Sequence, residues 1–389
     1  MSTTFETTEP TPIRPDQTPV LRPAERPQQR LGTKGGQLSR GGATGSGSSL
    51  RKFTTRLRNR ARKFATSKTV ASCGHHRTHG DVTVLRGEDG RASLGGLRTC
   101  QNVWACPTCY SKRIAEAGTA IQRGVVEAQK SGHAFSLLTL TCSHAWADDP
   151  GVVRRGLLKA WGDLQRRAGW RRLRVVDHAR RVELTFGQNG WHPHIHVLVV
   201  HLRELSEDER IDAEGALWEA WHAAVVRQLG PGHAPSAKHG LDLRRSRKHD
   251  YLAKLGLELT DVIGKKGKGS LTPLQVLSKA CDGDARMQTV WQQFCKAMKG
   301  CRMLEFRRES PYFKTAEKAV ERELAERPEQ TPIATIAASD WDAARSHRDV
   351  HWRLLEAAEG GGMDGVSREL ARILGDPLAA TRVRILSGR

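Results

Sequence analysis

Apolar residues along this chain follow two patterns, short β-branched runs and longer segments with helical spacing. Short runs of Val, Ile and Leu are typical of strands and predict them at 82–85, 134–141, 179–186, 192–201 and 241–244. Amphipathic spacing predicts helices at 111–130, 152–167, 204–228, 248–259 and 288–299. From residue 134 onward the order β-α-ββ-α-β-α predicts an α+β fold, in which helices cover an antiparallel sheet.

Two of the predicted strands are joined by Gly-Gln-Asn-Gly, a sequence typical of a hairpin turn. If the Gln and Asn are the two turn residues, Glu183 pairs with His194. If the turn lies one residue later, Glu183 pairs with His196. Both registers place the carboxylate on the face that carries the imidazoles, because side chains alternate along a strand. A three-residue loop would turn the carboxylate to the other face.

The second strand of this hairpin begins with Gly-Trp-His-Pro-His-Ile-His, in which His194 and His196 share one face and Ile195 points into the core. Two neutral imidazoles placed side by side form a chelating pair for a divalent metal. Two histidines and one carboxylate leave coordination positions open, which suits catalysis. The carboxylate of Glu183 argues against the alternative, in which the histidines only cap the edge of the sheet.

Four of the eight cysteines lie close together in the sequence, at Cys73, Cys100, Cys106 and Cys109. The Cys-Pro-Thr-Cys sequence forms a tight knuckle, and four thiolates close a tetrahedral structural Zn²⁺ site. Three histidines compete for one of these positions: His75, His76 and His79. The other four cysteines are scattered and are predicted to be core thiols. Reduced cysteines around a metal indicate a cytoplasmic protein.

The 389 residues can bury one catalytic domain with appendages. The chain has 63 basic and 42 acidic residues and a net charge of +21, which favours a polyanionic partner such as nucleic acid. A ribosomal-type protein or a membrane-surface binder would share the charge but not the paired histidines and carboxylate. Neither an apolar run long enough to cross a membrane nor a signal-peptide segment is found, so no membrane partner is expected.

Residues 1–66 are rich in Thr, Pro, Gly, Ser and Gln, which predicts a disordered basic arm. Seven of its basic residues lie between Arg51 and Lys63. This run is interpreted either as a solvated charged face or as a tether to the DNA backbone. Residues 67–115 form the predicted zinc-knuckle segment, 116–310 the catalytic domain and 311–389 a helical C-terminal region.

Only three tyrosines are present, at positions 110, 251 and 312. Tyr251 opens a predicted helix in which Lys254 and Glu258 lie on the same face. A phenol is a poor nucleophile unless a cation or a base assists it. Lys254 can stabilise the phenolate and Glu258 can transfer a proton. The alternative is an exposed amphipathic helix that starts with a half-buried tyrosine.

These motifs resemble those of rolling-circle plasmid replication initiators of the HUH endonuclease superfamily. Residues 135–141 are similar to the first strand motif of that family, and 190–196 with Glu183 are similar to its metal motif. Tyr251-Leu-Ala-Lys254 is similar to its tyrosine motif. Residues 100–109 are similar to the zinc knuckle of one branch, and segments beginning at Gly269 and Lys299 are also similar. The resemblance covers about 70–307.

The resemblance implies a replication initiator endonuclease that nicks origin DNA. Tyr251 would attack the scissile phosphate with Mn²⁺ or Mg²⁺ as catalytic cofactor, which leaves a 5′-phosphotyrosine and a free 3′-hydroxyl for a host polymerase. The substrate would be a single-stranded or extruded plasmid origin, and a host helicase is an implied partner. Many relatives carry a second aromatic residue at the position where this chain has Leu255. An active site with a single tyrosine needs another group to end the replication cycle, and Glu258 or Asp250 would serve this termination step.

Two other functions share part of this pattern. An HUH-type transposase would have the same knuckle, histidine pair and tyrosine. A non-catalytic zinc-dependent DNA-binding protein would keep the four cysteines and the charge but would need neither the metal motif nor Tyr251. A conjugative relaxase is disfavoured, because its metal site usually uses three histidines.

Overall fold

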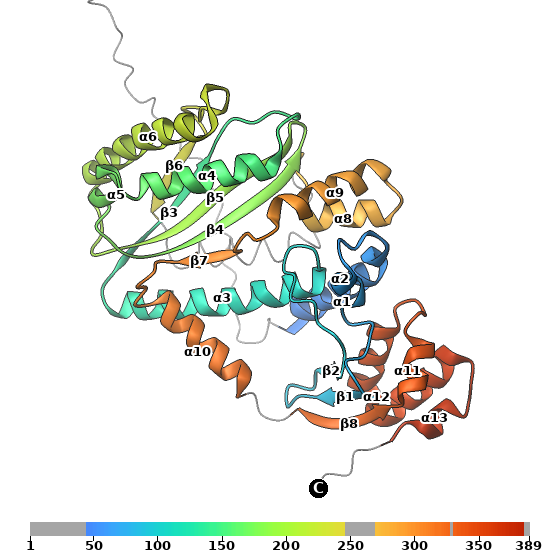
Figure 1. Ribbon diagram of the computed structural model, residues 1–389. Coiled ribbons are helices and arrows are strands. Elements are labelled where there is room, and N and C mark those ends of the chain that lie inside the picture. Colours follow the sequence, from blue (N-terminus) through green and yellow to red (C-terminus); the bar gives the residue numbers. More distant parts are fainter. Residues whose placement is uncertain (1–43, 246–268, 327–329, 385–389) are drawn as a thin grey trace, which may run out of the picture. The chain divides into compact units, whose positions relative to one another are not determined.

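The structure is a computed structural model that describes residues 44–245, 269–326 and 330–384 (Figure 1). The predicted helix at 248–259, with Tyr251, Lys254 and Glu258, lies outside these residues, as do Asp250 and Leu255. The strands described are β1 (Val82–Arg86), β2 (Ala92–Gly95), β3 (Ala134–Thr141), β4 (Val175–Gly187), β5 (Gly190–His201), β6 (Leu241–Arg245), β7 (Leu304–Phe306) and β8 (Thr331–Ile336).

The helices of the described residues are more numerous than the sequence predicted. They are α1 (Thr44–Ala61), α2 (Lys68–Ser72), α3 (Pro107–Lys130), α4 (Pro150–Leu164), α5 (Ala168–Arg172), α6 (Glu207–Leu229), α8 (Pro273–Cys281), α9 (Ala285–Met298), α10 (Phe313–Ala325), α11 (Ala338–Ala344), α12 (Val350–Leu374) and α13 (Ala379–Arg382), with short 3₁₀ turns at Arg62–Phe64 and Pro231–His233. None of the described helices is long and apolar enough to cross a membrane.

Five antiparallel strands form the larger sheet, in the order β6-β3-β5-β4-β7. Strand β3 covers the predicted residues 134–141. The turn between β4 and β5 consists of Gln188 and Asn189, so that Gly187 pairs with Gly190 and Glu183 pairs with His194. Of the two registers open to the sequence, the first is therefore the one that forms. The prediction of an α+β fold with helices on an antiparallel sheet is confirmed.

The two faces of this sheet differ in how they are covered. One face packs on α4 and α6 through residues such as Leu138, Ile195 and Trp221, and Figure 1 shows α4 lying across the strands. On the other face, Phe135 and Leu198 pack against α3 and α10 at one end of the strands. The other end of this face carries the polar side chains of the hairpin.

The helices begin at residues that cap them. Asp149 accepts hydrogen bonds from two backbone N–H groups in the first turn of α4, and Ser206 and Glu209 form a capping box at the start of α6. Proline occupies the first position of α3, where it has no hydrogen bond to lose. This proline explains why α3 begins at residue 107 rather than at the predicted residue 111.

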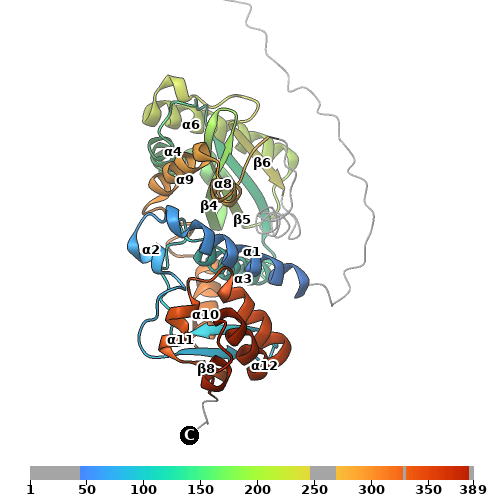
Figure 2. The ribbon, with the colours of Figure 1, turned by 90° about the vertical axis from the view of Figure 1, so that its right-hand side faces the viewer.

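A second sheet joins segments that are far apart in the sequence. Its strand order is β2-β1-β8, with Val84 opposite Ala334. Its apolar face packs on α11, α12 and α13 through Trp341 and Leu354 among others, and α12 lies beside these strands in both views (Figures 1 and 2). The C-terminal region is therefore mainly helical, as predicted, but it also supplies a strand to a sheet that begins in the zinc-knuckle segment.

The prediction of a disordered arm up to residue 66 is wrong for its last part. Residues 44–61 form α1, whose Leu57 is 2% exposed and belongs to a core with α3 and α8. Two basic side chains of α1 have acidic partners on α12, with ion pairs from Arg51 to Glu359 and from Lys52 to Glu356. These partners come from the other end of the sequence, so the local composition did not reveal the helix.

Candidate metal centre and active site

Glu183, His194 and His196, here called the Glu–His–His triad, meet on the polar end of the larger sheet. The Nε2 atoms of His194 and His196 lie 2.8 Å and 3.0 Å from the same carboxylate oxygen of Glu183. One donor atom from each residue lies within 4.8 Å of the others. Imidazole nitrogens with a carboxylate oxygen form a donor set that suits a divalent metal, so this group can hold one ion.

Both histidines are oriented by hydrogen bonds at their other ring nitrogen. The Nδ1 atom of His196 lies 3.1 Å from the hydroxyl of Thr139 on β3. The Nδ1 atom of His194 lies 3.2 Å from the backbone carbonyl of His192. Without an ion, an Nε2–H can donate to Glu183. When Nδ1–H donates to these oxygens and Nε2 carries no proton, the Nε2 lone pair is open to a metal ion. Such outer partners set the tautomer and the ring orientation of metal-binding histidines.

The carboxyl group of Glu183 is held in its charged form by the histidines. Burial alone would raise the pKa of Glu183, but charge interactions and hydrogen bonds with His194 and His196 outweigh burial and lower the pKa well below its ordinary value. A metal ligand of this kind must be deprotonated. The arrangement therefore supplies an ionised carboxylate beside two imidazoles.

Replacing Thr139 with Val is expected to weaken metal binding at the triad by about 10- to 100-fold, because the substitution removes the hydroxyl that orients His196 and keeps the side-chain volume. Titration of the apoprotein with Mn²⁺ by calorimetry measures the effect. Thr141→Val is the matched control, since the Thr141 hydroxyl lies 3.0 Å from Nε2 of His192 rather than from a triad residue. Equal affinities in the two variants would contradict the assigned role of Thr139.

Two further histidines, His192 and His144, lie near the triad and were not among the predicted site residues. His192 precedes His194 by two residues, so strand alternation places it on the same face. Its Nδ1 lies 3.1 Å from Nδ1 of His144, and the two rings are 4.6 Å apart. Burial, followed by the nearby histidines, lowers the pKa of His192 to about 3. The periodicity of the strand could have identified His192, but His144 lies in a loop that no pattern connects to the triad.

Of the three tyrosines, only Tyr110 and Tyr312 belong to the described residues. The hydroxyl of Tyr312 lies 2.9 Å from Nε2 of His133. Tyr110 stands on the first turn of α3, where its hydroxyl accepts a hydrogen bond of 3.3 Å from Arg181. Tyr110, Arg181 and Glu183 line the same cavity. Tyr110 is therefore the described tyrosine nearest in role to a nucleophile, and an experiment that identifies the attacking residue has to distinguish it from Tyr251.

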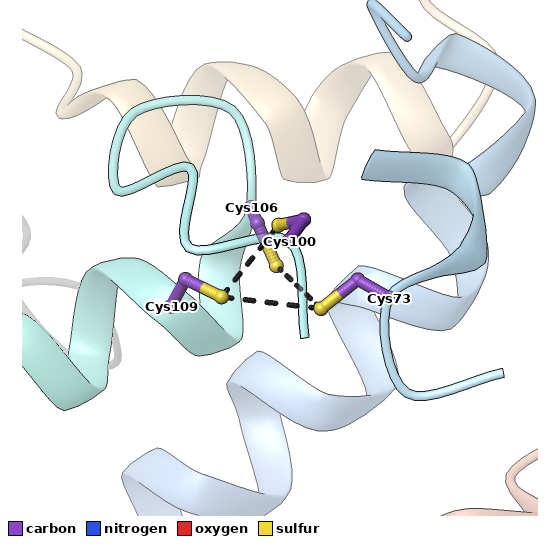
Figure 3. A group of neighbouring side chains, drawn as sticks. All are labelled: Cys73, Cys100, Cys106 and Cys109. Atoms are coloured by element: carbon purple, nitrogen blue, oxygen red, sulfur yellow. Dashed lines mark hydrogen bonds between the residues drawn. The ribbon is translucent and has the colours of Figure 1, made fainter. Parts of the chain in front are cut away.

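Cys73, Cys100, Cys106 and Cys109, here called the Cys cluster, converge from three places in the chain (Figure 3). Cys73 follows α2, Cys109 lies in the first turn of α3, and the other two lie before that helix. Adjacent sulfur atoms are 3.6–3.9 Å apart. Four sulfurs at about 2.3 Å from a tetrahedral Zn²⁺ would be separated by about 3.8 Å. The cluster therefore fits a four-thiolate metal site.

The three histidines that competed for a place in the Cys cluster are not part of it. His75 contacts Arg62, with ring nitrogens 2.6 Å and 2.9 Å from the guanidinium, and His76 lies 2.9 Å from Arg345. Three of the remaining cysteines are buried, at positions 142, 295 and 301, and Cys281 is partly buried.

Comparison with known proteins supports the family suggested by the motifs. The profile of a family described as replication protein, Rep_1, matches residues 92–212, a segment that includes the triad and three of the four clustered cysteines. A protein named Protein rep from Streptomyces lividans is 25% identical over 302 residues, which cover 58% of this chain and 66% of that protein, just under two thirds. No solved structure matches the chain significantly. The resemblance to replication initiators is confirmed by both matches.

Proposed function

From this resemblance and from the Glu–His–His triad, we propose that the chain initiates rolling-circle plasmid replication by nicking origin DNA. The observation that carries the proposal is the convergence of Glu183, His194 and His196 on one end of an otherwise covered sheet face. The substrate is a single-stranded or extruded segment of the origin. The product is a free 3′-hydroxyl, which a host polymerase extends while a host helicase unwinds the duplex.

In the proposed reaction the Tyr251 oxygen attacks the scissile phosphorus. The bond from phosphorus to the 3′-oxygen breaks, and that oxygen takes up a proton as the 5′-phosphotyrosine forms. Lys254 stabilises the phenolate, and Glu258 transfers the proton. The triad would hold Mn²⁺ or Mg²⁺, which when bound polarises the phosphate oxygens. The Cys cluster would hold a structural Zn²⁺ with no position left for substrate.

Charge supports DNA as the partner. With a net charge of +21, contacts to phosphates supply affinity that falls steeply as salt rises, because binding releases condensed counterions. Phosphate contacts position the DNA without reading its sequence. The chemistry at the triad and the affinity for DNA are therefore separable by mutation.

Tyr251→Phe is expected to abolish covalent attachment to DNA while folding barely changes, because the substitution removes one oxygen and keeps the ring. Lys254→Ala is expected to slow attachment without ending it, since a supporting cation contributes part of the barrier reduction. The measurement incubates the protein with single-stranded origin DNA and Mn²⁺, and maps the adduct by gel and mass spectrometry.

Tyr110→Phe and Tyr312→Phe are the matched controls for this experiment, and both are expected to form the adduct as the unmodified protein does. Attachment at Tyr110, or an active Tyr251→Phe variant, would overturn the choice of nucleophile. Absence of any cleavage in the presence of metal would favour the non-catalytic zinc-dependent DNA-binding protein. A related transposase would cleave in the same way, and is distinguished by whether its DNA element moves rather than replicates.

A further inference from the structure

An exposed tryptophan lies at the end of the larger sheet where the β4–β5 hairpin turns. Trp146 belongs to the loop at 142–149, between β3 and α4, and it is 50% exposed. Large apolar side chains in that state are few in the described residues. An aromatic ring left in solvent beside a candidate nuclease site is a feature that the Glu–His–His triad does not explain.

Two side chains contact the ring of Trp146, and the loop that carries it passes close to Gly190. Phe186 meets it edge-on, with ring centres 5.5 Å apart. The guanidinium of Arg286, near the start of α9, lies over the ring at 4.7 Å from its centre. At Gly190, where φ is +87°, an added Cβ would lie 3.4 Å from the Cα of Trp146. That distance is an ordinary van der Waals contact, so a side chain would fit beside the loop, and glycine is favoured at this position by its positive φ.

The same loop reaches the triad through histidine. His144, two residues before Trp146, packs its ring on His192, with centres 4.6 Å apart. The ring of His192 is in turn 5.2 Å from that of His194. Along β5, the four steps from Gly190 to His194 span about 13 Å. Trp146 thus lies a few nucleotides from the place where a scissile phosphate would bind.

Charge around Trp146 favours a nucleic-acid strand. Arg286 forms no ion pair with an acidic residue among the described residues, and its guanidinium lies over the Trp146 ring. The two acidic residues of the loop are engaged with backbone: Asp148 accepts from the N–H of Ala145 at 2.6 Å, and Asp149 caps α4. The guanidinium covers one side of the ring, half of the tryptophan remains exposed to a base, and the cation has no acidic partner in the described part of the chain that would compete with a phosphate.

We propose that Trp146 and Arg286 form a subsite that stacks one base of single-stranded DNA beside the Glu–His–His triad. Every base has a π-face, so stacking on an aromatic side chain tolerates any sequence. The guanidinium of Arg286 holds the neighbouring phosphate. The subsite fixes the strand relative to the triad, and it rests on the proposed function of nicking single-stranded DNA.

Crosslinking to a 20-nucleotide oligodeoxyuridine that carries 5-iodouracil tests the subsite directly, because light joins this base to an aromatic ring stacked on it. Peptide mapping of the irradiated full-length protein is expected to locate the crosslink at Trp146. The measurement needs neither metal nor cleavage, so it is independent of the nucleophile. A crosslink confined to other residues would overturn the proposal.

Binding of fluorescent oligothymidylate supplies the second measurement. Trp146→Leu keeps an apolar contact with Gly190 and Phe186 but removes the π-face, and is expected to weaken binding by roughly 5- to 150-fold. Trp146→Phe should retain most of the affinity. Leu202→Ala is the control, because Leu202 is 58% exposed and follows the opposite end of β5; it should bind as the unmodified protein does.

The two experiments separate this subsite from the proposed function. If Trp146→Leu loses the crosslink and the unmodified protein forms the tyrosine adduct, both the subsite and the proposed nicking function are supported. A Trp146 crosslink in a protein that never forms a tyrosine adduct keeps the subsite and overturns the nuclease. Unchanged oligothymidylate binding in a folded Trp146→Leu variant overturns the subsite, as would be the case if Trp146 instead docked a partner protein.

Discussion

Replacing both His194 and His196 with alanine is expected to reduce DNA cleavage by roughly 1,000-fold or more, because the triad loses two of its three donors and the metal that polarises the phosphate is no longer held. DNA binding should change by less than about threefold, since phosphate contacts elsewhere set the affinity. Cleavage of labelled single-stranded origin DNA in Mn²⁺ and anisotropy measurements on the same DNA provide the two readouts.

The matched control for this experiment is His192→Ala, in which a neighbouring imidazole on the same face is removed and the triad stays intact. This variant should still bind Mn²⁺, because the Nδ1–H of His194 donates to the backbone carbonyl of residue 192 and not to its side chain. If the double variant still cleaves DNA after the metal has been removed, the triad is not the site of the catalytic metal.

Much of the triad could be predicted because its residues are close in sequence. In a hairpin with a two-residue turn, counting from the turn gives the cross-strand partners, so Glu183 was expected to face His194 in one register and His196 in the other. The length of β3 was equally predictable, since 134–141 is a continuous run of apolar and hydroxyl side chains without a charged residue, Gly or Pro. Local periodicity is sufficient wherever the partners in space are also neighbours along the chain.

Long-range pairing was not predictable in this way. Strand β8 pairs with β1 although about 250 residues separate them, and no sequence pattern in either segment identifies the other as its partner. Helix α1 has its apolar residues at helical spacing, but a short basic helix is stable only because α3, α8 and the acids of α12 are nearby. The periodicity of one segment does not reveal which distant elements will pack against it.

The Trp146 loop shows the same limit for function. Nothing in the composition of 142–149 distinguishes a surface tryptophan from a core one, and only the packing on Gly190 and Phe186 shows that the ring is exposed beside the hairpin. The sequence identified the residues that would do chemistry, because chemistry requires particular side chains. Which residues can position a substrate depends on where the loops lie in space. Residues of this kind could be identified only from the fold.

The second large effect is expected at the Cys cluster, where Cys106→Ser should remove one equivalent of zinc per chain and lower the melting temperature by at least about 5 °C. A four-thiolate ion contributes folding free energy directly. Here it would join the end of α2 to the first turn of α3, and α3 in turn packs on the larger sheet and on α10. Metal analysis of natively purified protein and thermal unfolding measure the two effects.

A buried cysteine outside the cluster provides the control for the zinc experiment. Cys142→Ala alters a core thiol on the other side of the sheet, so it should cost some stability but keep its zinc. Chelation should lower the melting temperature of the unmodified protein and of Cys142→Ala, and leave that of Cys106→Ser unchanged. Zinc-free native protein with four reactive thiols would contradict a structural ion. If zinc is confirmed, α3 is anchored by the ion at its first turn and by its packing on the sheet, and Tyr110 of that first turn lines the same cavity as Glu183 of the triad.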